Sequence, residues 1–378
     1  MELTGEREAS LVAIDYLRGL AALGVAIYHV RIPLWIGWHD ITAHPERFTV
    51  ADRVIGWLSA PVPFMGNLVM LFFVISGFCI HWPLAGNDRG LKLPAYAARR
   101  FFRIYPAYLV AVLISWAIGV SLQVPDTNQR LLPSIAMIQN YCGPDVAFES
   151  MRQIQTNWAL WSLPVEMELY AVYPLLLLAL RRAGPNLTLL ACVIVSLPSA
   201  VFAEQKGWPT FAPYLVIWFA GAWLAEQWRS RKLRPPPFGI AIVAILALGL
   251  GCMIEATHRF AAWEHLAFGA FYFWLVWLVL TRPQWWQPFI PRAAGSLGWL
   301  GARSYSLYLV HFPLFYLFGA FWVARFGEKP HNFLIPLLAV VLILPIVAVF
   351  YAFIERPSHL FAKRIAKRWS QSENTVIA

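Results

Sequence analysis

Charged residues are scarce in this sequence. Only 13% of its 378 residues are Asp, Glu, Lys or Arg, whereas 59% are hydrophobic. A globular protein of this length cannot bury so much apolar surface in its own core. The composition therefore excludes an ordinary soluble enzyme and indicates a protein whose solvent is lipid. The 19 Trp agree with this, since Trp favours the headgroup level of a membrane.

Cysteine is also scarce, and the few cysteines show no metal-binding or disulfide pattern. Cys79, Cys142, Cys192 and Cys252 are far apart and form no CxxC pair. We expect small buried side chains rather than a disulfide framework or a metal site. The first ten residues, MELTGEREAS, lack the basic region of a cleaved signal peptide. The first hydrophobic segment is therefore predicted to serve as its own membrane signal.

The sequence contains long hydrophobic runs. Runs of about 20 residues can span a bilayer as helices, and they predict an all-α, polytopic bundle of about ten transmembrane helices. The helices are expected at 11–30, 63–82, 105–123, 158–180, 187–203, 211–228, 238–255, 263–281, 304–323 and 333–354. With short tails at about 1–10 and 357–378, they are expected to form one transmembrane domain, 1–378.

Lysine and arginine alternate between the segments that join these helices. The segments at 83–104, 181–186, 229–237, 282–303 and 356–368 are rich in basic residues, and the intervening ones are poor in them. Because basic residues gather on the cytoplasmic side, both termini are predicted to be cytoplasmic. The net charge of +10 is explained by these segments. It favours contact with anionic lipid and a phosphorylated ligand, and nucleic acid is not indicated as a partner.

Ionisable residues also lie inside the hydrophobic segments, where lipid penalises them. In IDYLRGLAALGVAIYHV, Arg18 and His29 share one helical stripe and lie about 16 Å apart along the helix axis. Arg18 could form only an i,i+3 ion pair with Asp15. His29 could be an interfacial histidine bonded to a loop. The alternative for both is a functional polar site in the membrane.

Two further segments offer charged candidates. Arg100 and Arg103 stand one helical turn apart in the loop segment ARRFFRIYP. Such a pair suits phosphate oxygens, although membrane topology alone explains the charge equally well. In WSLPVEMELYAVYP, Glu166 and Glu168 point about 200° apart, so at most one faces a shared cavity. We expect Glu166 to be that residue, either supporting a neighbouring arginine or taking part in chemistry.

Other polar positions favour structural roles. His311 in SYSLYLVHFPLFY is expected to be a satisfied interior histidine. Ser76 and Gly77 in FFVISGF predict close helix packing. Glu355, which precedes Arg356 and Pro357, predicts a structural ion pair at the inner end of the last helix.

Six motifs in this order resemble the acyltransferase-3 family of integral membrane O-acyltransferases. They are RGLAALGVAIYH, FFVISGF, RRFFRIYP, WSLPVEMELYAVYP, SYSLYLVHFPL and IERP, and the resemblance runs from residue 14 to 357. The family includes O-antigen acetyltransferases and relatives that act on exopolysaccharides, peptidoglycan and macrolide sugars. Many members carry a fused extracellular esterase-like domain, which is not expected in a chain of this length.

The resemblance implies an enzyme of the bacterial cytoplasmic membrane that moves an acyl group, usually acetyl, from cytoplasmic acyl-CoA to a carbohydrate hydroxyl. It implies that His29 is the catalytic histidine and Arg18 its motif partner. It also implies that Arg100 and Arg103 are the pair associated with the CoA donor. Glu166 is expected to orient a charged partner. No metal is expected.

Two questions stay open from the sequence. His29 could act as a general base on the sugar hydroxyl or as a transient acyl carrier. A transporter or flippase of a lipid-linked sugar could also use the same buried charges without acyl chemistry. Transporters often show Gly- or Pro-broken segments in two related halves, which we do not find. The acceptor pocket is expected to come from the loops at 31–53 and 124–157.

Overall fold

The computed structural model describes residues 2–86, 90–142, 154–206, 210–257, 261–293 and 295–375. These residues form helices and connecting turns, with no strand among them, so the all-α prediction is confirmed. The helices are α1 (Glu2–Leu34), α2 (Trp38–Ala43), α3 (Val50–Leu58), α4 (Leu68–His81), α5 (Leu93–Ser121), α6 (Thr127–Ile135), α7 (Ser162–Ala183), α8 (Pro185–Lys206), α9 (Leu215–Arg229), α10 (Phe238–Thr257), α11 (Ala261–Thr281), α12 (Pro283–Trp286), α13 (Ile290–Ala293), α14 (Ser296–Phe326), α15 (Leu334–Leu342), α16 (Leu344–Phe350) and α17 (Arg356–Thr375).

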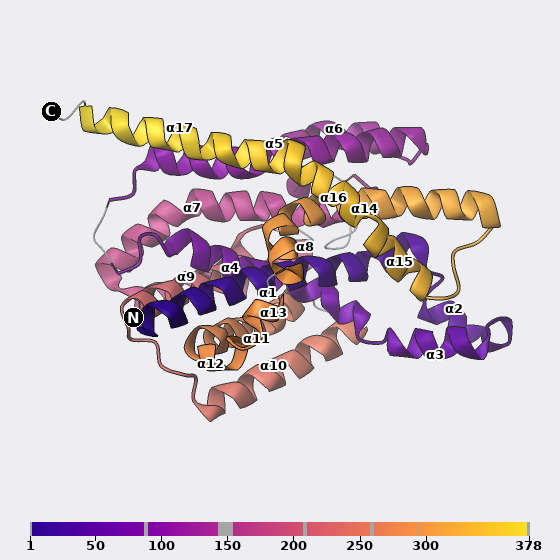
Figure 1. The fold of residues 1–378 in the computed structure, drawn as a ribbon, viewed down its shortest axis with the longest axis horizontal. Coiled ribbons are helices and arrows are strands. Elements are labelled where there is room, and N and C mark those ends of the chain that lie inside the picture. The colour runs from indigo at the N-terminus through magenta and orange to yellow at the C-terminus, as the bar shows by residue number, and fades with distance from the viewer. Residues whose placement is uncertain are drawn as a thin grey trace.

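Nine helical stretches in the described part of the chain are long and apolar enough to cross a membrane. They correspond to nine of the ten predicted helices. The remaining predicted helix, 211–228, corresponds to α9. This helix has only 15 residues because a 3-10 turn containing Pro213 precedes it. Figure 1 shows α1 beginning and α17 ending at the same end of the bundle. A chain whose two ends lie on the same side of a membrane crosses it an even number of times. We therefore count α9 as a tenth pass beside the nine longer helices.

The main correction concerns α5, which begins at Leu93 and not near residue 105. Pro94 lies in its first turn, where a missing N–H costs nothing and the fixed φ suits a helix. Arg100 and Arg103 therefore lie on a helix and not in a loop. The expected tails are also helical, since α1 begins at Glu2 and α17 packs along α5 (Figure 1).

Close packing of helices is seen where small residues meet. A side chain at Gly77 on α4 would overlap the carbonyl group of Trp218 on α9, and one at Gly221 would overlap that of Val74. Only glycine allows two backbones to approach so closely. The packing role predicted for Gly77 is therefore confirmed.

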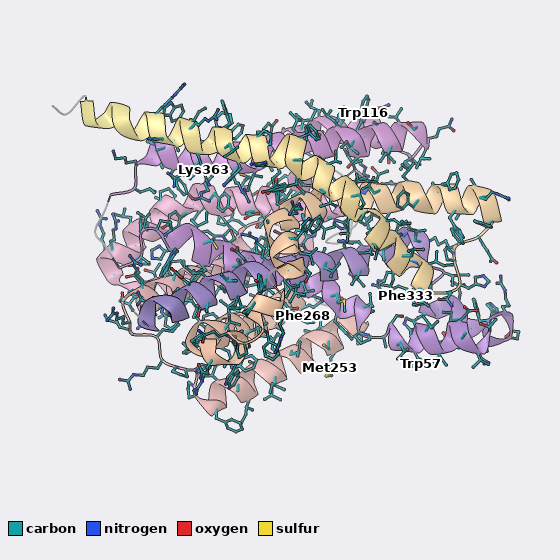
Figure 2. All side chains as sticks on the ribbon, viewed as in Figure 1. Trp57, Trp116, Met253, Phe268, Phe333 and Lys363 are labelled. Atoms are coloured by element: carbon teal, nitrogen blue, oxygen red, sulfur yellow. The ribbon has the colours of Figure 1, made fainter. Side chains whose placement is uncertain are left out.

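The outer surface of the bundle is apolar. Met253 on α10 and Trp57 on α3 are each 68% exposed, whereas Phe268 on α11 is only 1% exposed (Figure 2). Large apolar side chains also cover the outside of α8 and much of α10. A surface of this kind is stable in lipid and not in water. Together with the nine apolar helices, it shows that the chain is an integral membrane protein.

Candidate functional site

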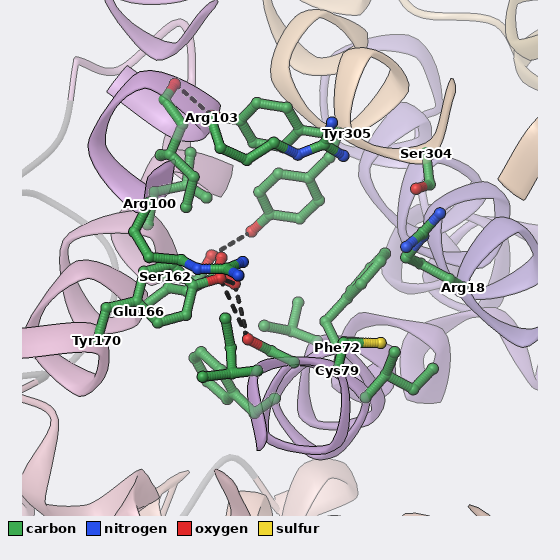
Figure 3. Close-up of a pocket in the computed structure, with 18 residues that line it drawn as sticks. Arg18, Phe72, Cys79, Arg100, Arg103, Ser162, Glu166, Tyr170, Ser304 and Tyr305 are labelled. Carbon is green, nitrogen blue, oxygen red and sulfur yellow. Dashed lines mark hydrogen bonds between the residues drawn. The ribbon is translucent and has the colours of Figure 1, made fainter. Parts of the chain in front are cut away.

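A cavity lies between α1, α4, α5, α7 and α14, and we call it the central cavity (Figure 3). Its polar lining residues are Arg18, Ser76, Cys79, Arg100, Arg103, Ser162, Glu166, Tyr170, Ser304, Tyr305 and Tyr308. Four of the five predicted site residues therefore meet in one place. Cys79 was expected to be buried, but it is exposed here because it faces this cavity.

Glu166 is held by hydroxyl groups of the central cavity. Its Oε1 accepts hydrogen bonds from the Ser76 hydroxyl, at 2.9 Å, and from the Tyr170 hydroxyl. Glu168 lies on the other face of α7 and accepts a hydrogen bond from Tyr141. The prediction that only Glu166 faces the cavity is confirmed. Among the described residues, Glu166 makes no ion pair with an arginine, so hydroxyls replace its expected charged partner.

Arg100 is placed by aromatic rings and not by an acidic side chain. Its guanidinium lies 5.8 Å from the ring centre of Tyr96 and 5.9 Å from that of Tyr170. Tyr170 therefore contacts both Arg100 and Glu166. The Nε of Arg100 is buried and has no hydrogen-bond partner in the structure. Arg100 therefore keeps donor capacity for a ligand.

Arg103 is held more firmly. Its Nη1 donates to Nδ1 of His359 at 2.7 Å, and its Nη2 lies 3.4 Å from Oε1 of Glu355. Glu355 is 1% exposed and also accepts hydrogen bonds from the amide and hydroxyl of Ser306. A π-helical segment, Tyr351–Glu355, brings Glu355 to this position. The structural ion pair predicted for Glu355 is confirmed, with Arg103 as its partner.

A second cavity, the basic cavity, lies between α5 and α17. It is lined by Arg99, Arg100, Arg103, His359, Ala362, Lys363 and Lys367. It shares Arg100 and Arg103 with the central cavity. The residues of α17 are not among the predicted site residues, because the sequence predicts a short tail after residue 357. The signal was present, since His359, Lys363 and Lys367 repeat every four residues on one helical face.

Arg18 is fixed at the contact between α1 and α14. Its Nη2 donates to the carbonyl of Gly301 at 3.0 Å and lies 3.1 Å from Oδ1 of Asp15. A Cβ at Gly301 would lie 2.5 Å from the carbonyl oxygen of Asp15, so glycine permits this approach. The predicted ion pair with Asp15 is therefore present. It does not use every donor, because Nε of Arg18 is buried and has no partner in the part of the chain that the structure describes.

His29 lies in a third cavity, which we call the histidine cavity. Its lining residues are Tyr28, His29, Ile32, Pro63, Gly66, Asn67, Val69, Trp158, Trp161, Glu255, Glu264 and His265. Val69 also lines the central cavity. Arg18 and His29 thus line adjoining cavities and not a single one. Of the predicted acceptor loops, only Ile32 contributes among the described residues, and 143–153 lie outside them.

The hydrogen bonds of His311 fix the proton positions on both histidines. Nδ1 of His311 lies 2.9 Å from the carbonyl oxygen of Leu307. A carbonyl can only accept, so this Nδ1 carries hydrogen, and Nε2 of a neutral His311 must accept. Nδ1 of His29, 2.9 Å from that Nε2, is then the donor. Nε2 of His29 is left with a free lone pair, as a general base requires.

This arrangement corrects one expectation and confirms another. His29 bonds a side chain of α14 and not a loop. His311 is fully buried and hydrogen-bonded, which confirms the expected satisfied interior histidine. Its partner was missed, because nothing in the sequence shows that α1 and α14 bring these two residues together.

Known proteins resemble this chain along most of its length. A family model described as an acyltransferase domain matches residues 11–354. The acyltransferase MdmB of Streptomyces mycarofaciens is 26% identical over 258 residues, which cover 65% of this chain and 59% of that protein. The peptidoglycan O-acetyltransferase OatA of Listeria monocytogenes is 25% identical over 337 residues, which cover 80% and 49% of the two chains.

A putative O-acetyltransferase of Staphylococcus aureus is also 25% identical, over 82% of this chain and 51% of its own length. The chain thus spans about half the length of the curated relatives it matches. No solved structure matches it. The family match covers residues 11–354, which include the helices of the central and histidine cavities and the α5 side of the basic cavity, but not α17. Because it spans nearly the whole chain, the chain belongs to the acyltransferase-3 family of membrane acyltransferases.

Proposed function

We propose that this protein is an O-acyltransferase of the bacterial cytoplasmic membrane. It would move an acetyl group from acetyl-CoA to a hydroxyl of a carbohydrate or cell-surface glycan, within a single transmembrane domain (1–378). The observation that carries the proposal is the succession of three cavities. The basic cavity shares Arg100 and Arg103 with the central cavity, and the central cavity shares Val69 with the histidine cavity.

The basic cavity suits the phosphates of CoA. Arg99, Lys363 and Lys367 line it together with the two shared arginines, and it has no acidic lining residue among those described. Arginine forks and lysine ammonium groups both bind phosphate oxygens. With the phosphates held there, the uncharged pantetheine arm enters the central cavity. Nε of Arg18, which has no hydrogen-bond partner among the described residues, is available to bind a carbonyl of that arm or of the thioester.

The chemical step takes place at His29. Nε2 of His29 removes the proton of the acceptor hydroxyl, and the hydroxyl oxygen attacks the thioester carbonyl carbon. The carbon–sulfur bond then breaks, and the departing thiolate takes the proton from His29 to give free CoA and an O-acetyl ester. Throughout the step, Nδ1–H of His29 stays bonded to His311, which holds the ring in orientation. This arrangement meets the requirement of a general base, a free Nε2 lone pair.

Orientation follows from charge. The end of the bundle at which α1 begins also carries the basic cavity, where Lys363 is seen on α17 (Figure 2). The positive-inside bias assigns that end to the cytoplasm. Both termini are then cytoplasmic, and acyl-CoA reaches the site from that side. The acceptor approaches the histidine cavity from the other half of the membrane.

Release of CoA by purified protein tests this function. The protein is mixed with acetyl-CoA and with surface glycan stripped of its O-acetyl groups by mild base, and free thiol is measured. We expect glycan-dependent CoA release that falls by about 10²- to 10⁴-fold in His29→Ala, the usual contribution of a general base. A transporter would move sugar without releasing CoA. Absence of any His29-dependent release would overturn the proposal.

A further inference from the structure

Two carboxyl groups line the histidine cavity together with His29. Glu255 comes from α10 and Glu264 from α11, and Glu264 is 7% exposed and accepts a hydrogen bond from Asn67. The described lining residues of this cavity include no Lys or Arg. The nearest basic residue on α1, Arg31, lies over the ring of Tyr28 at 4.6 Å. The two ends of the cavity series therefore differ in sign, basic at one end and acidic at the other.

Aromatic rings line the same cavity. Trp158, Trp161 and Tyr28 contribute rings from two separate elements, the 3-10 turn Trp158–Trp161 and α1. The ring of Trp161 is stacked on His265, with ring centres 5.7 Å apart and planes 11° apart. Rings of this kind offer apolar faces to the C–H groups of a ligand, while carboxylates accept hydrogen bonds from its hydroxyls. Both features suit a sugar ring.

One polar atom of this cavity wall lacks a partner. Nε1 of Trp158 is buried and makes no hydrogen bond in the structure. A buried donor without a partner is unfavourable, and a ligand oxygen that accepts from it would remove this cost. Trp158 is close to the reacting group, because Phe312 packs against both rings, 5.9 Å from Trp158 and 5.1 Å from His29. A ligand bonded to Trp158 would therefore lie beside His29.

We propose that the histidine cavity is the acceptor site and that it accepts uncharged or cationic sugars and rejects acidic ones. The sugar contacts Trp158, and the indole N–H of Trp158 donates to a ring or hydroxyl oxygen. Glu255 and Glu264 accept from hydroxyl or amino groups and repel a carboxylate or phosphate on the sugar. The inference rests on the function proposed above, since it assumes acyl transfer at His29.

The sugar that receives the ester tests the charge rule. The gene is deleted in the source organism and restored as wild type or as His29→Ala, and mass spectrometry identifies which sugar residue carries the His29-dependent ester. We expect a neutral or amino sugar. An ester on a uronic, sialic or phosphorylated sugar would overturn the inference while supporting the proposed function. Absence of any His29-dependent ester and of CoA release would instead overturn the proposed function, and this inference with it.

Kinetics of purified variants test the residues. Trp158→Phe keeps the ring and removes the N–H, and Glu255→Gln and Glu264→Gln keep the shape and remove the charge. With the stripped glycan as acceptor, we expect each substitution to raise the KM for the acceptor about three- to tenfold, as the loss of one hydrogen bond would. The KM for acetyl-CoA should not change. Trp57→Phe, at an exposed position on α3, is the matched control and should change neither. Unchanged acceptor KM, or an equal rise in both KM values, would contradict the assignment.

Discussion

His29 and His311 are joined by a hydrogen bond across the contact between α1 and α14. Their facing nitrogens are 2.9 Å apart, and the two rings are tilted by only 29°. The bond from His311 to the carbonyl of Leu307 fixes the direction of this contact, so His29 donates and His311 accepts. His311 is thus a positioning residue for His29, although it does not line the histidine cavity.

The first prediction concerns this acceptor nitrogen. His311→Gln places an amide oxygen where Nε2 stands and can still accept from His29, whereas His311→Leu cannot. We expect kcat to fall about tenfold or more in His311→Leu, on the scale of a lost orienting partner, and less in His311→Gln. The measurement is CoA release, with the unfolding temperature of each variant recorded. Equal losses in both variants would mean that His311 serves packing alone.

The second prediction concerns the phosphates of the donor. Lys363→Gln together with Lys367→Gln removes two positive charges from the basic cavity and none from the central cavity. We expect the KM for acetyl-CoA to rise about tenfold, since each charge contact contributes roughly 0.5–1 kcal/mol near a surface. S-acetyl-N-acetylcysteamine has the thioester but no phosphate, and its KM should not change. A similar change for both donors would place the phosphates elsewhere.

A third prediction concerns helix packing. Gly77→Ala forces a methyl group against the carbonyl of Trp218, and it should lower the free energy of unfolding by about 1–3 kcal/mol through overpacking. Gly249→Ala on α10 is the control, because nothing lies within 4 Å of its added Cβ. Alanine is also the better helix former, so the control should be neutral or stabilising. Thermal unfolding in detergent measures both, and equal behaviour would contradict the close α4–α9 contact.

The fourth prediction concerns orientation. Tags at either terminus or in the segment 229–237 should be accessible only from the cytoplasm, and a tag at Gln123 should be accessible only from outside. The reason is the gathering of basic residues at the end where α1 begins. Protease protection in spheroplasts and inverted vesicles measures this. An externally accessible C-terminus with a cytoplasmic N-terminus would require an odd number of passes, which the shared end in Figure 1 does not allow.

The sequence predicts the helices well and the contacts between them poorly. Hydropathy places the nine long apolar helices of the described part of the chain, because lipid leaves a long apolar helix few alternatives. The direction of Glu166 also follows from helical geometry. By contrast, the start of α5 and the course of α17 were missed, because these amphipathic helices carry charge and continue beyond the apolar core. The bond between His29 and His311, separated by 282 positions, depends on tertiary packing that no local pattern reports.

The central claim is that the donor thioester reaches the cavity between Arg18 and Glu166 on its way to His29. Cys79 lines this cavity and is exposed to it, so its thiol reports occupancy directly. The measurement uses a protein with Cys79 as its sole cysteine, in a His29→Ala background that prevents turnover. The rate of alkylation by N-ethylmaleimide is followed with and without acetyl-CoA.

At an acetyl-CoA concentration about ten times the dissociation constant, alkylation of Cys79 should slow about tenfold, because the bound fraction is shielded. Free phosphate at the same concentration should give no protection, since it fits the basic cavity only. As a control, the same single-cysteine protein with His29 retained must release CoA. If it does, and acetyl-CoA still leaves the alkylation rate of Cys79 unchanged, a donor route through the central cavity is contradicted.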